Sequence, residues 1–372
     1  MEYCARDLAE LAGAVLIHFD FPVSLVVSGS VLMKNNEIYH LFCENAKKRF
    51  PRLEIMKMRG ELPREPSGSY YGRQEKGTDM KQYLAIDIGG TYIKYSLMDP
   101  EYRVLHEGSV PTEKQPARFL RQFMEIVETY VDHISGAAIC MGGFIHPVTG
   151  ENTDFSVGAN FRAYRLNEEI NRKYPIPAVL ENDSNCAALG EMVRGAGRGY
   201  EDICMVTFGT GIGGAIIINR ELHRGSHFKS GEVGFTRVGL READKKPVAE
   251  GAGATSLLVR KVSEILGREV DGAYIFNHLD HPDINRIYRE WLYKGAMVIG
   301  NFAVTVDPQI LLIGGGISEN KIFIRDMKEA VYTLYPHLEP YTAIEACEQG
   351  NMAGRIGALY LLLQSKEGGV QS

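Results

Sequence analysis

The sequence has 372 residues, of which 45% are hydrophobic and 24% charged, with a net charge of -6 and an isoelectric point near 6.0. These values are typical of a globular protein with two or three domains, and they argue against a broad cationic surface and so against nucleic acid as the main partner. No stretch approaches 18 uninterrupted apolar residues, so we expect no membrane-spanning helix.

The first ten residues, MEYCARDLAE, carry acids where a secretory signal is basic and then apolar, so we expect a cytoplasmic protein. The six cysteines never fall as a CxxC pair. Scattered cysteines of this kind are typical of reduced thiols in the cytosol.

Residues 1–66 alternate between expected helices and strands. The spacing of apolar side chains predicts a helix over 5–19, a strand at VSLVVSG, a helix over about 36–49 and a strand at LEIMKM. The same order returns late in the chain, around QILLIGGGISENKIFIRDM, and indicates a partial internal repeat. Residues 67–79 are rich in glycine and charge, which predicts a linker.

The stretch LAIDIGGTYIK, residues 84–94, carries the first candidate site. An apolar run, Tyr83 to Ile88, predicts a buried strand with Asp87 near its end, and two glycines and Thr91 follow. Glycines without a Cβ let backbone N–H groups approach a phosphate, and an acid beside them can hold a metal ion or water. A glycine pair after a strand is by itself more often a plain hairpin turn.

Two further glycine turns and one acid complete a set. Residues 203–218, ICMVTFGTGIGGAIII, and residues 308–317, PQILLIGGGI, each place glycines after an apolar strand. Between the first and second turns, ENDSNCAALGE places Asp183 between a short strand and an alanine-rich helix. Asp183 is then either a general base or the N-cap of that helix.

The run GTGIGG, residues 209–214, also fits the GxGxxG pattern of dinucleotide-binding proteins. That pattern needs a helix that begins inside the glycines, because the helix N-terminus binds the pyrophosphate. The residues that follow, AIIINREL, are β-branched, with Asn219 and Arg220 as a turn. The sequence therefore favours a strand, a turn and a strand over a dehydrogenase.

In their order and spacing these motifs resemble the ROK family of sugar kinases, a branch of the actin and hexokinase-like ATPase superfamily, from Tyr83 to the C-terminus. The resemblance implies an α/β protein with two ribonuclease H-like lobes, at 80–200 and 201–372, and an N-terminal α/β appendage at 1–66. It implies a sugar substrate, ATP and Mg²⁺ as cofactors and a homodimer.

The resemblance also implies a set of site residues, with Asp183 as the general base. For ATP and its phosphates it implies Asp87, Gly89, Gly90, Thr91, Lys94, Gly209, Thr210, Gly211, Gly314, Gly315 and Gly316, where the last three begin a helix on the adenosine side. For the sugar it implies Gly143, Asn160, Asn182, Asp183 and Glu232. Magnesium is expected to be held mainly by ATP, near Asp87, and Asn160 is equally well explained as a loop cap.

The family's zinc site is missing from the sequence. Glu232 in SGEVGF matches a GExGH element whose His is a zinc ligand, but Phe235 stands in its place, and no cysteine lies between Cys204 and Cys347. We expect no zinc, and Glu250 as the substitute for a glutamate that the zinc run otherwise carries. The combination resembles zinc-free bacterial β-glucoside kinases and implies transfer to the 6-hydroxyl of a glucose unit.

Other interpretations stay open. Glucokinase and N-acetylmannosamine kinase are alternatives within the family. A sugar-sensing repressor of the same family needs a winged helix-turn-helix, which residues 1–79, with as many basic as acidic residues, do not resemble. A sugar-binding protein without turnover is disfavoured by Asp87, the glycine turns and Asp183.

Residues 1–66 resemble the C-terminal end of a BadF-type N-acetylglucosamine kinase without its phosphate turns. They are interpreted either as a docked appendage or as the remnant of a neighbouring reading frame, with Met80 as an alternative start.

Overall fold

The computed structural model describes residues 23–27, 53–57, 81–154, 157–238 and 253–367. The chain divides into two compact units, one of Met1–Asp79 with Phe235–Leu240 and one of Met80–Gly234 with Arg241–Ser372. The predicted domain bounds remain a prediction.

In the first unit, β1 (Val23–Val27) and β2 (Leu53–Lys57) pair in parallel. Parallel neighbours need a crossover connection, as the expected alternation of helix and strand provides. The helices expected at 5–19 and 36–49, and the linker, lie outside the described residues.

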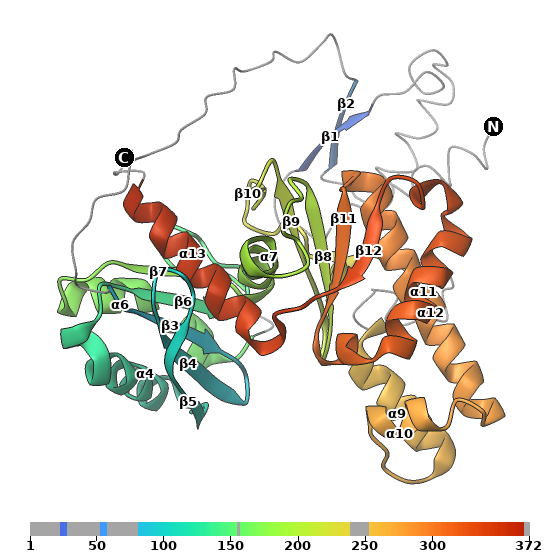
Figure 1. Ribbon diagram of the computed structural model, residues 1–372, viewed down its shortest axis with the longest axis horizontal. Helices are drawn as coiled ribbons and strands as arrows, with labels where there is room; N and C mark the ends of the chain where they lie inside the picture. The colour runs from blue at the N-terminus through green and yellow to red at the C-terminus, as the bar shows by residue number, and fades with distance from the viewer. Residues whose placement is uncertain (1–22, 28–52, 58–80, 155–156, 239–252, 368–372) are drawn as a thin grey trace. The chain divides into compact units, whose positions relative to one another are not determined.

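The second unit contains two five-stranded sheets (Figure 1). The first has the order β5-β4-β3-β6-β7. Its central strand, β3 (Tyr83–Ile88), is antiparallel to β4 (Tyr92–Met98) and parallel to β6 (Ala137–Met141). Strands β5 (Val104–Pro111) and β7 (Ala178–Asn182) pair with β4 and β6. The strand predicted from the apolar run Tyr83 to Ile88 is confirmed.

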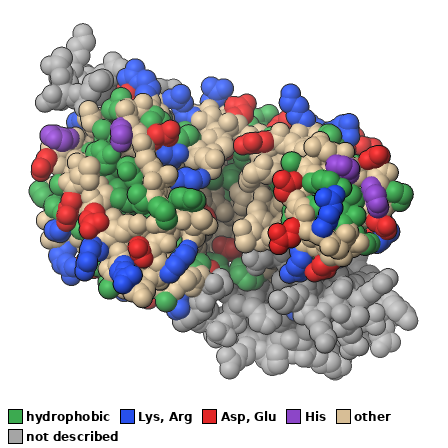
Figure 2. All heavy atoms as spheres, turned by 90° about the horizontal axis from the view of Figure 1, so that it is seen from below, with side chains coloured by type: hydrophobic (Ala, Val, Ile, Leu, Met, Phe, Trp, Pro, Cys, Tyr) green, Lys and Arg blue, Asp and Glu red, His purple; other side chains and the backbone are tan. Residues whose placement is uncertain are grey.

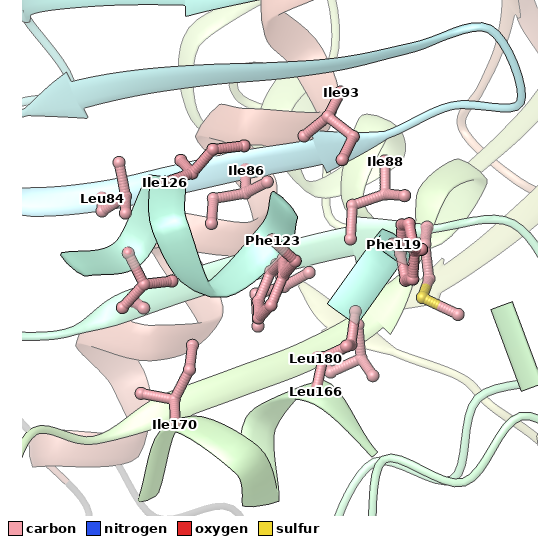
Figure 3. Packing of buried hydrophobic residues seen from close by; sticks show 14 of the residues in the cluster. Leu84, Ile86, Ile88, Ile93, Phe119, Phe123, Ile126, Leu166, Ile170 and Leu180 are labelled. Atoms are coloured by element: carbon pink, nitrogen blue, oxygen red, sulfur yellow. The ribbon is translucent and has the colours of Figure 1, made fainter. Parts of the chain in front are cut away.

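Strand β3 is covered on both faces, which explains its continuous apolar sequence. Its alternate side chains enter two hydrophobic clusters. One cluster joins Leu84, Ile86 and Ile88 to Phe119 and Phe123 of α4 (Pro116–Tyr130) and to Leu166 and Ile170 of α6 (Leu166–Lys173) (Figure 3). The other joins Tyr83 and Ala85 to Ile356, Leu359 and Leu362 of α13 (Ala353–Glu367). Short helices η1 (Val131–His133) and α5 (Ala159–Arg162) lie in the connections of this lobe.

The second sheet has the order β10-β9-β8-β11-β12. Strand β8 (Ile203–Phe208) is antiparallel to β9 (Ile212–Ile218) and parallel to β11 (Ile310–Gly314), and β12 (Ala343–Ala346) extends the parallel part. The hairpin from β9 to β10 (Glu221–Leu222) turns at Asn219 and Arg220, whose φ angles are 53° and 64°. Positive φ at both central residues matches the tight hairpin turn that the sequence predicts.

The helices of the second lobe follow in chain order. They are η2 (Val233–Phe235), α9 (Thr255–Leu266), α10 (Gly272–Asn277), α11 (Pro282–Val306), η3 (Gly316–Glu319), α12 (Lys321–Leu334), η4 (Pro336–Leu338) and η5 (Gly350–Met352). Helix α11 begins at Pro282, where proline is tolerated in the first turn. None of the helices in the described ranges has the length and apolarity needed to cross a bilayer.

Two helices join the lobes, α7 (Asp183–Arg194) and α13. Their backbones approach so closely that a Cβ on Gly190 would lie 2.1 Å from the carbonyl oxygen of Ala353, and one on Gly357 would lie 1.7 Å from that of Cys186. Helix α7 also packs its residues Ala188, Leu189 and Met192 on strands β8 and β9. The N-terminus of α7, with Asp183, is therefore held by both sheets.

Candidate active site

The two predicted acids lie at one edge of the first sheet. Asp87 of β3 is in register with Cys140 of β6, which is in register with Glu181 of β7, so the carboxyl ends of three parallel strands meet there. Asp183 follows two residues after Glu181. A Cβ on Gly142, just past β6, would lie 3.6 Å from Oδ2 of Asp183. The edge therefore brings Asp87 and Asp183 together, next to the backbone of Gly142, which has no side chain.

The pKa values of both acids are raised. Burial is the largest cause for Asp183, although its side chain keeps contact with solvent, and the hydrogen bond from the Ser184 N–H opposes the rise. Burial also raises the pKa of Asp87, and so does the charge of Asp183, while Lys94 and Arg355 act in the opposite direction. Perturbed carboxyl groups that face each other are typical of functional sites.

Asp183 is not the N-cap of its helix. The cap is Asn182, whose Oδ1 accepts a hydrogen bond from the Asn185 N–H at 3.0 Å. Asp183 lies in the first turn, where Oδ1 accepts from the Ser184 N–H at 2.8 Å. The competing interpretation of Asp183 as a cap is therefore wrong, and its carboxylate stays directed at the sheet edge.

The first glycine turn joins β3 to β4. Gly89 N–H donates to the Tyr92 carbonyl at 3.0 Å, while Gly90 and Thr91 are exposed. Lys94 is in register with Asp87 and donates through Nζ to Oδ1 of Asn351 at 2.8 Å. The turn is a hairpin, as the alternative interpretation holds, and it presents two exposed residues beside Asp87.

The second glycine turn joins β8 to β9 and contacts α7. A Cβ on Gly213 would lie 2.4 Å from Oγ of Ser184, so glycine is required for this approach. The Gly209 carbonyl accepts from the Thr255 N–H at 3.0 Å, and Oγ of Ser256 donates to the Thr210 carbonyl at 2.9 Å. The antiparallel pairing of β8 and β9 confirms the strand, turn and strand, and it is incompatible with a dinucleotide-binding helix at this site.

The third turn differs from its prediction. Gly315 has a φ of 89°, and a Cβ there would lie 2.1 Å from the Phe208 carbonyl oxygen. The glycines lead into the 3₁₀ turn η3, and the α-helix begins only at Lys321, capped by Asn320. The prediction that Gly314, Gly315 and Gly316 themselves begin a helix is wrong, because Asn320 supplies the cap.

The predicted sugar residues come from several elements. Asn182 donates through Nδ2 to the Gly143 carbonyl at 3.0 Å, and Gly143 has a φ of 115°. Asn160 is buried in α5 and donates through Nδ2 to the Glu113 carbonyl at 3.0 Å. Glu232 is half-buried beside η2. The structure thus places Asn182 and Gly143 together, whereas Asn160 contacts the connection between β5 and α4.

An ion pair that the sequence analysis missed links the lobes at this edge. Glu181 is nearly fully buried and accepts from Nε of Arg224 at 2.6 Å. Its other oxygen accepts from the Asn182 N–H at 2.9 Å and from Nδ2 of Asn185 at 3.0 Å. An acid inside the apolar run AVLEN was the only sequence signal for it. In the space-filling view of Figure 2, the visible face of the molecule is hollowed near its middle.

No zinc-type ligand cluster occurs in the part of the chain that the structure describes, where no three His, Cys, Asp or Glu side chains come together to hold a metal ion. Phe235 ends η2, and Glu250 lies outside the described residues. His223 and His227 follow β10 in a loop rather than a helix.

Comparisons with known proteins agree with this geometry. A sequence model of the ROK family matches residues 83–365. The β-glucoside kinase of Listeria monocytogenes serovar 1/2a is 31% identical over 296 residues, which cover 76% of this chain and 97% of the relative.

Solved structures agree as well. A ROK family protein of Streptococcus pneumoniae TIGR4, solved with sucrose, is 31% identical with a TM-score of 0.70, covering 77% of this chain and 99% of its own. A ROK family glucokinase of Streptomyces griseus, solved with glucose and AMPPNP, shares the fold at 24% identity and a TM-score of 0.66, covering 76% of this chain and 99% of its own. The predicted two-lobed α/β fold is confirmed.

Proposed function

The chain belongs to the ROK family, and we propose that it transfers the γ-phosphoryl group of ATP to the 6-hydroxyl of a hexose unit, with a β-glucoside such as cellobiose as the preferred acceptor. The single observation that carries this proposal is the place of Asp183. It leaves the capping of α7 to Asn182 and lies beside Asp87, at the point where the hairpin of the second glycine turn contacts the same helix.

In the proposed reaction, Asp183 accepts the proton of the sugar hydroxyl as that oxygen forms a bond to the γ-phosphorus. The bond between the γ-phosphorus and the bridging oxygen breaks, and ADP leaves with the electron pair. A carboxylate whose pKa is raised by burial is a stronger base than a solvated one. Catalysis then consists mainly of alignment and charge stabilisation, as in other phosphoryl transfers.

The phosphates are assigned to the first two glycine turns, and magnesium, which offsets the phosphate charge, to the neighbourhood of Asp87. These residues fit an anion with a metal ion. Gly90 and Thr91 are exposed, a Cβ on Gly90 or Gly209 would meet nothing within 4 Å, and Asp87 supplies a carboxylate. Lys94 and Arg355 contribute positive charge close to Asp87.

The sugar is assigned to Asn182, Glu232, Asn160 and the Gly143 turn. A carboxylate accepts hydrogen bonds from hydroxyl groups, and an amide both accepts and donates them. Asn182 and Asn160 each donate to a backbone carbonyl that holds them in place. Held side chains lose less entropy when a ligand binds.

The choice of a β-glucoside rests on the relative from Listeria monocytogenes and on Phe235 in place of a zinc-ligating histidine. A glucokinase is the second candidate. The two candidates are distinguished by measuring ATP consumption with cellobiose, glucose, N-acetylmannosamine and N-acetylglucosamine, and by phosphorus NMR of the product. We expect the highest kcat/KM with cellobiose and a 6-phosphate product. A preference for glucose would favour glucokinase, and no sugar-dependent ATP use would refute kinase activity.

Further features of the protein belong to this proposal. We propose MgATP as the phosphoryl donor, lobes at 80–200 and 201–372, a homodimer and a cytoplasmic location, without nucleic acid as a partner. The described sheets support the lobe bounds, since β7 and α7 lie before residue 200 and β8 begins after it. The negative net charge supports the absence of nucleic acid.

A further inference from the structure

The segment of residues 111–115, from the last residue of β5 to the residue before α4, holds the whole first glycine turn. The backbone N–H of Thr112 donates to the Thr91 carbonyl at 2.9 Å, and its Oγ1 donates to the Gly89 carbonyl at 2.7 Å. The ammonium group of Lys114 donates to the Gly90 carbonyl. Three consecutive carbonyl groups of the turn are thus bound by one segment.

This arrangement sets the direction of the turn's N–H groups. All described peptide bonds are trans, and in a trans peptide the N–H points away from the carbonyl of the preceding residue. Because the carbonyls of Gly89 and Gly90 point at the 111–115 segment, the N–H groups of Gly90 and Thr91 point away from it. The turn therefore presents donors, and not carbonyl oxygens, on the side opposite the segment, which is the polarity that an anion requires.

The other end of the same segment reaches a predicted sugar residue. The Glu113 carbonyl accepts from Nδ2 of the buried Asn160. Gln122 of α4 closes the segment from both ends, since Oε1 accepts from the Glu113 N–H at 3.1 Å and Nε2 donates to the Pro111 carbonyl at 2.8 Å. A shift of Asn160 is thereby transmitted over one peptide unit to Thr112 and Lys114.

We propose that the 111–115 segment couples sugar binding to ATP binding, with Thr112 as the positioning residue for the phosphate turn and Lys114 as a further cation beside it. The inference rests on the proposed function, because it needs a sugar at Asn160 and phosphates at the turn. Sugar that orders Asn160 also orders Glu113 and the turn, so the triphosphate binds a turn that is already aligned. By linkage, ATP raises the affinity for sugar by the same factor.

The test measures the affinity for magnesium AMPPNP by calorimetry, with and without a saturating sugar that the enzyme phosphorylates. Wild-type protein is compared with Thr112→Val, which deletes the hydroxyl and keeps the branched shape, and with Thr112→Ser, which restores it. Thr129→Val is the matched control, because Oγ1 of Thr129 also donates to a backbone carbonyl, that of Glu125, on α4. Lys114→Met removes the charge of an exposed side chain and keeps most of its stem.

In the wild type we expect sugar to tighten AMPPNP binding at least fivefold, at the lower end of typical couplings. Thr112→Val should weaken AMPPNP binding about fivefold, as expected for one lost hydrogen bond, and reduce the sugar effect to less than twofold. Thr112→Ser and Thr129→Val should behave like the wild type. Lys114→Met should weaken AMPPNP binding severalfold, and it tests the turn independently if the Thr112 variant does not fold.

A wild-type protein that phosphorylates sugar but binds AMPPNP equally with and without it would overturn the coupling and leave the proposed function standing. The coupling would also be overturned if sugar still tightened AMPPNP binding fully in Thr112→Val, or if Thr129→Val lost AMPPNP affinity as much as Thr112→Val. An unchanged AMPPNP affinity in Lys114→Met would overturn it as well. Absence of any sugar-dependent ATP turnover would instead refute the proposed function, and the inference with it.

Discussion

Breaking the Glu181–Arg224 ion pair is expected to destabilise the protein more than loss of any surface pair. The two side chains are 3% and 27% exposed, and Nε of Arg224 lies 2.6 Å from Oε2 of Glu181. The pair connects the end of β7 in the first lobe to the loop after β10 in the second. Its loss therefore acts on both lobes and on Asn182, which Glu181 also binds.

The two single substitutions should differ in cost. Arg224→Met leaves a buried carboxylate with two neutral donors, Asn182 N–H and Asn185 Nδ2, and breaking a buried pair in this way costs about 3–5 kcal/mol. We expect about 3 kcal/mol, since those donors remain. Glu181→Gln keeps an acceptor for Asn182 and leaves an Arg224 that can turn to water, so about 1.5–3 kcal/mol is expected.

Urea unfolding of the wild type, both single variants and the double variant gives a double-mutant cycle, from which the coupling energy of Glu181 and Arg224 is obtained. We expect a coupling energy of about 1.5–3 kcal/mol. The control cycle uses the surface pair of Arg165 and Glu151, whose side chains are 45% and 53% exposed and whose Nη2 and Oε2 atoms lie 3.1 Å apart. Its coupling energy should be less than about 1 kcal/mol. Equal coupling in the two cycles, or an Arg224→Met cost below about 1 kcal/mol, would refute the argument from burial.

Four further results are expected. Asp183→Asn should lower kcat by about 10² to 10⁴ while calorimetry still detects sugar binding, and an unchanged kcat would remove Asp183 as the base. Because burial raises the pKa of Asp183 and the base must be unprotonated, kcat/KM should fall with decreasing pH above the usual carboxylate range, and a profile flat down to about pH 4 would contradict this. Metal analysis should find zinc well below one per chain, with activity intact after chelation once magnesium is restored, whereas stoichiometric zinc lost together with folding would be the opposite result. A chain that begins at Met80 should keep turnover, since every predicted site residue follows it, and a folded but inactive product would assign the first 79 residues a part in the site.

The strands were the most predictable part of the fold. Strands β3 and β8 were predicted from apolar runs, and they are found where those runs lie. The reason is physical, because a strand covered on both faces needs an apolar side chain at nearly every position. The glycines that follow β3 and β8 then fix where the chain must turn.

Features set by distant contacts were not predictable in the same way. Gly315 looks like a helix start in the sequence, but its left-handed conformation and its contact with the Phe208 carbonyl come from the neighbouring strand. Helix α11 is similar, since its buried residues Tyr288 and Trp291 pack against aromatic rings far away in the sequence, those of Phe276 in α10, Phe323 in α12 and Phe208 in β8. Neither contact is encoded in local spacing.

The residues of the candidate site also fall into a predictable group and a group set by distant contacts. Asp87 and Asp183 were predicted from their places at strand ends, and Asn182 from the resemblance of ENDSNCAALGE to the family's motif. Parallel strands bring their carboxyl ends to one edge. Arg224, Thr112 and Lys114 were missed because they reach that edge from loops, through hydrogen bonds to residues 20 or more positions away. Loop residues of this kind carry no periodic signal.

Three consecutive side chains at the end of β7 have three separate tasks, and the geometry of the strand explains why. Successive side chains of a strand point to opposite faces, and the change to a helix at Asp183 turns the third in a new direction. Glu181 binds the second lobe through Arg224, Asn182 caps α7 and binds the Gly143 carbonyl, and Asp183 is left for the proposed role of base. A helix that began one residue later would make Asp183 the cap and occupy its carboxylate. The asparagine before the aspartate therefore keeps the Asp183 carboxylate out of the capping role.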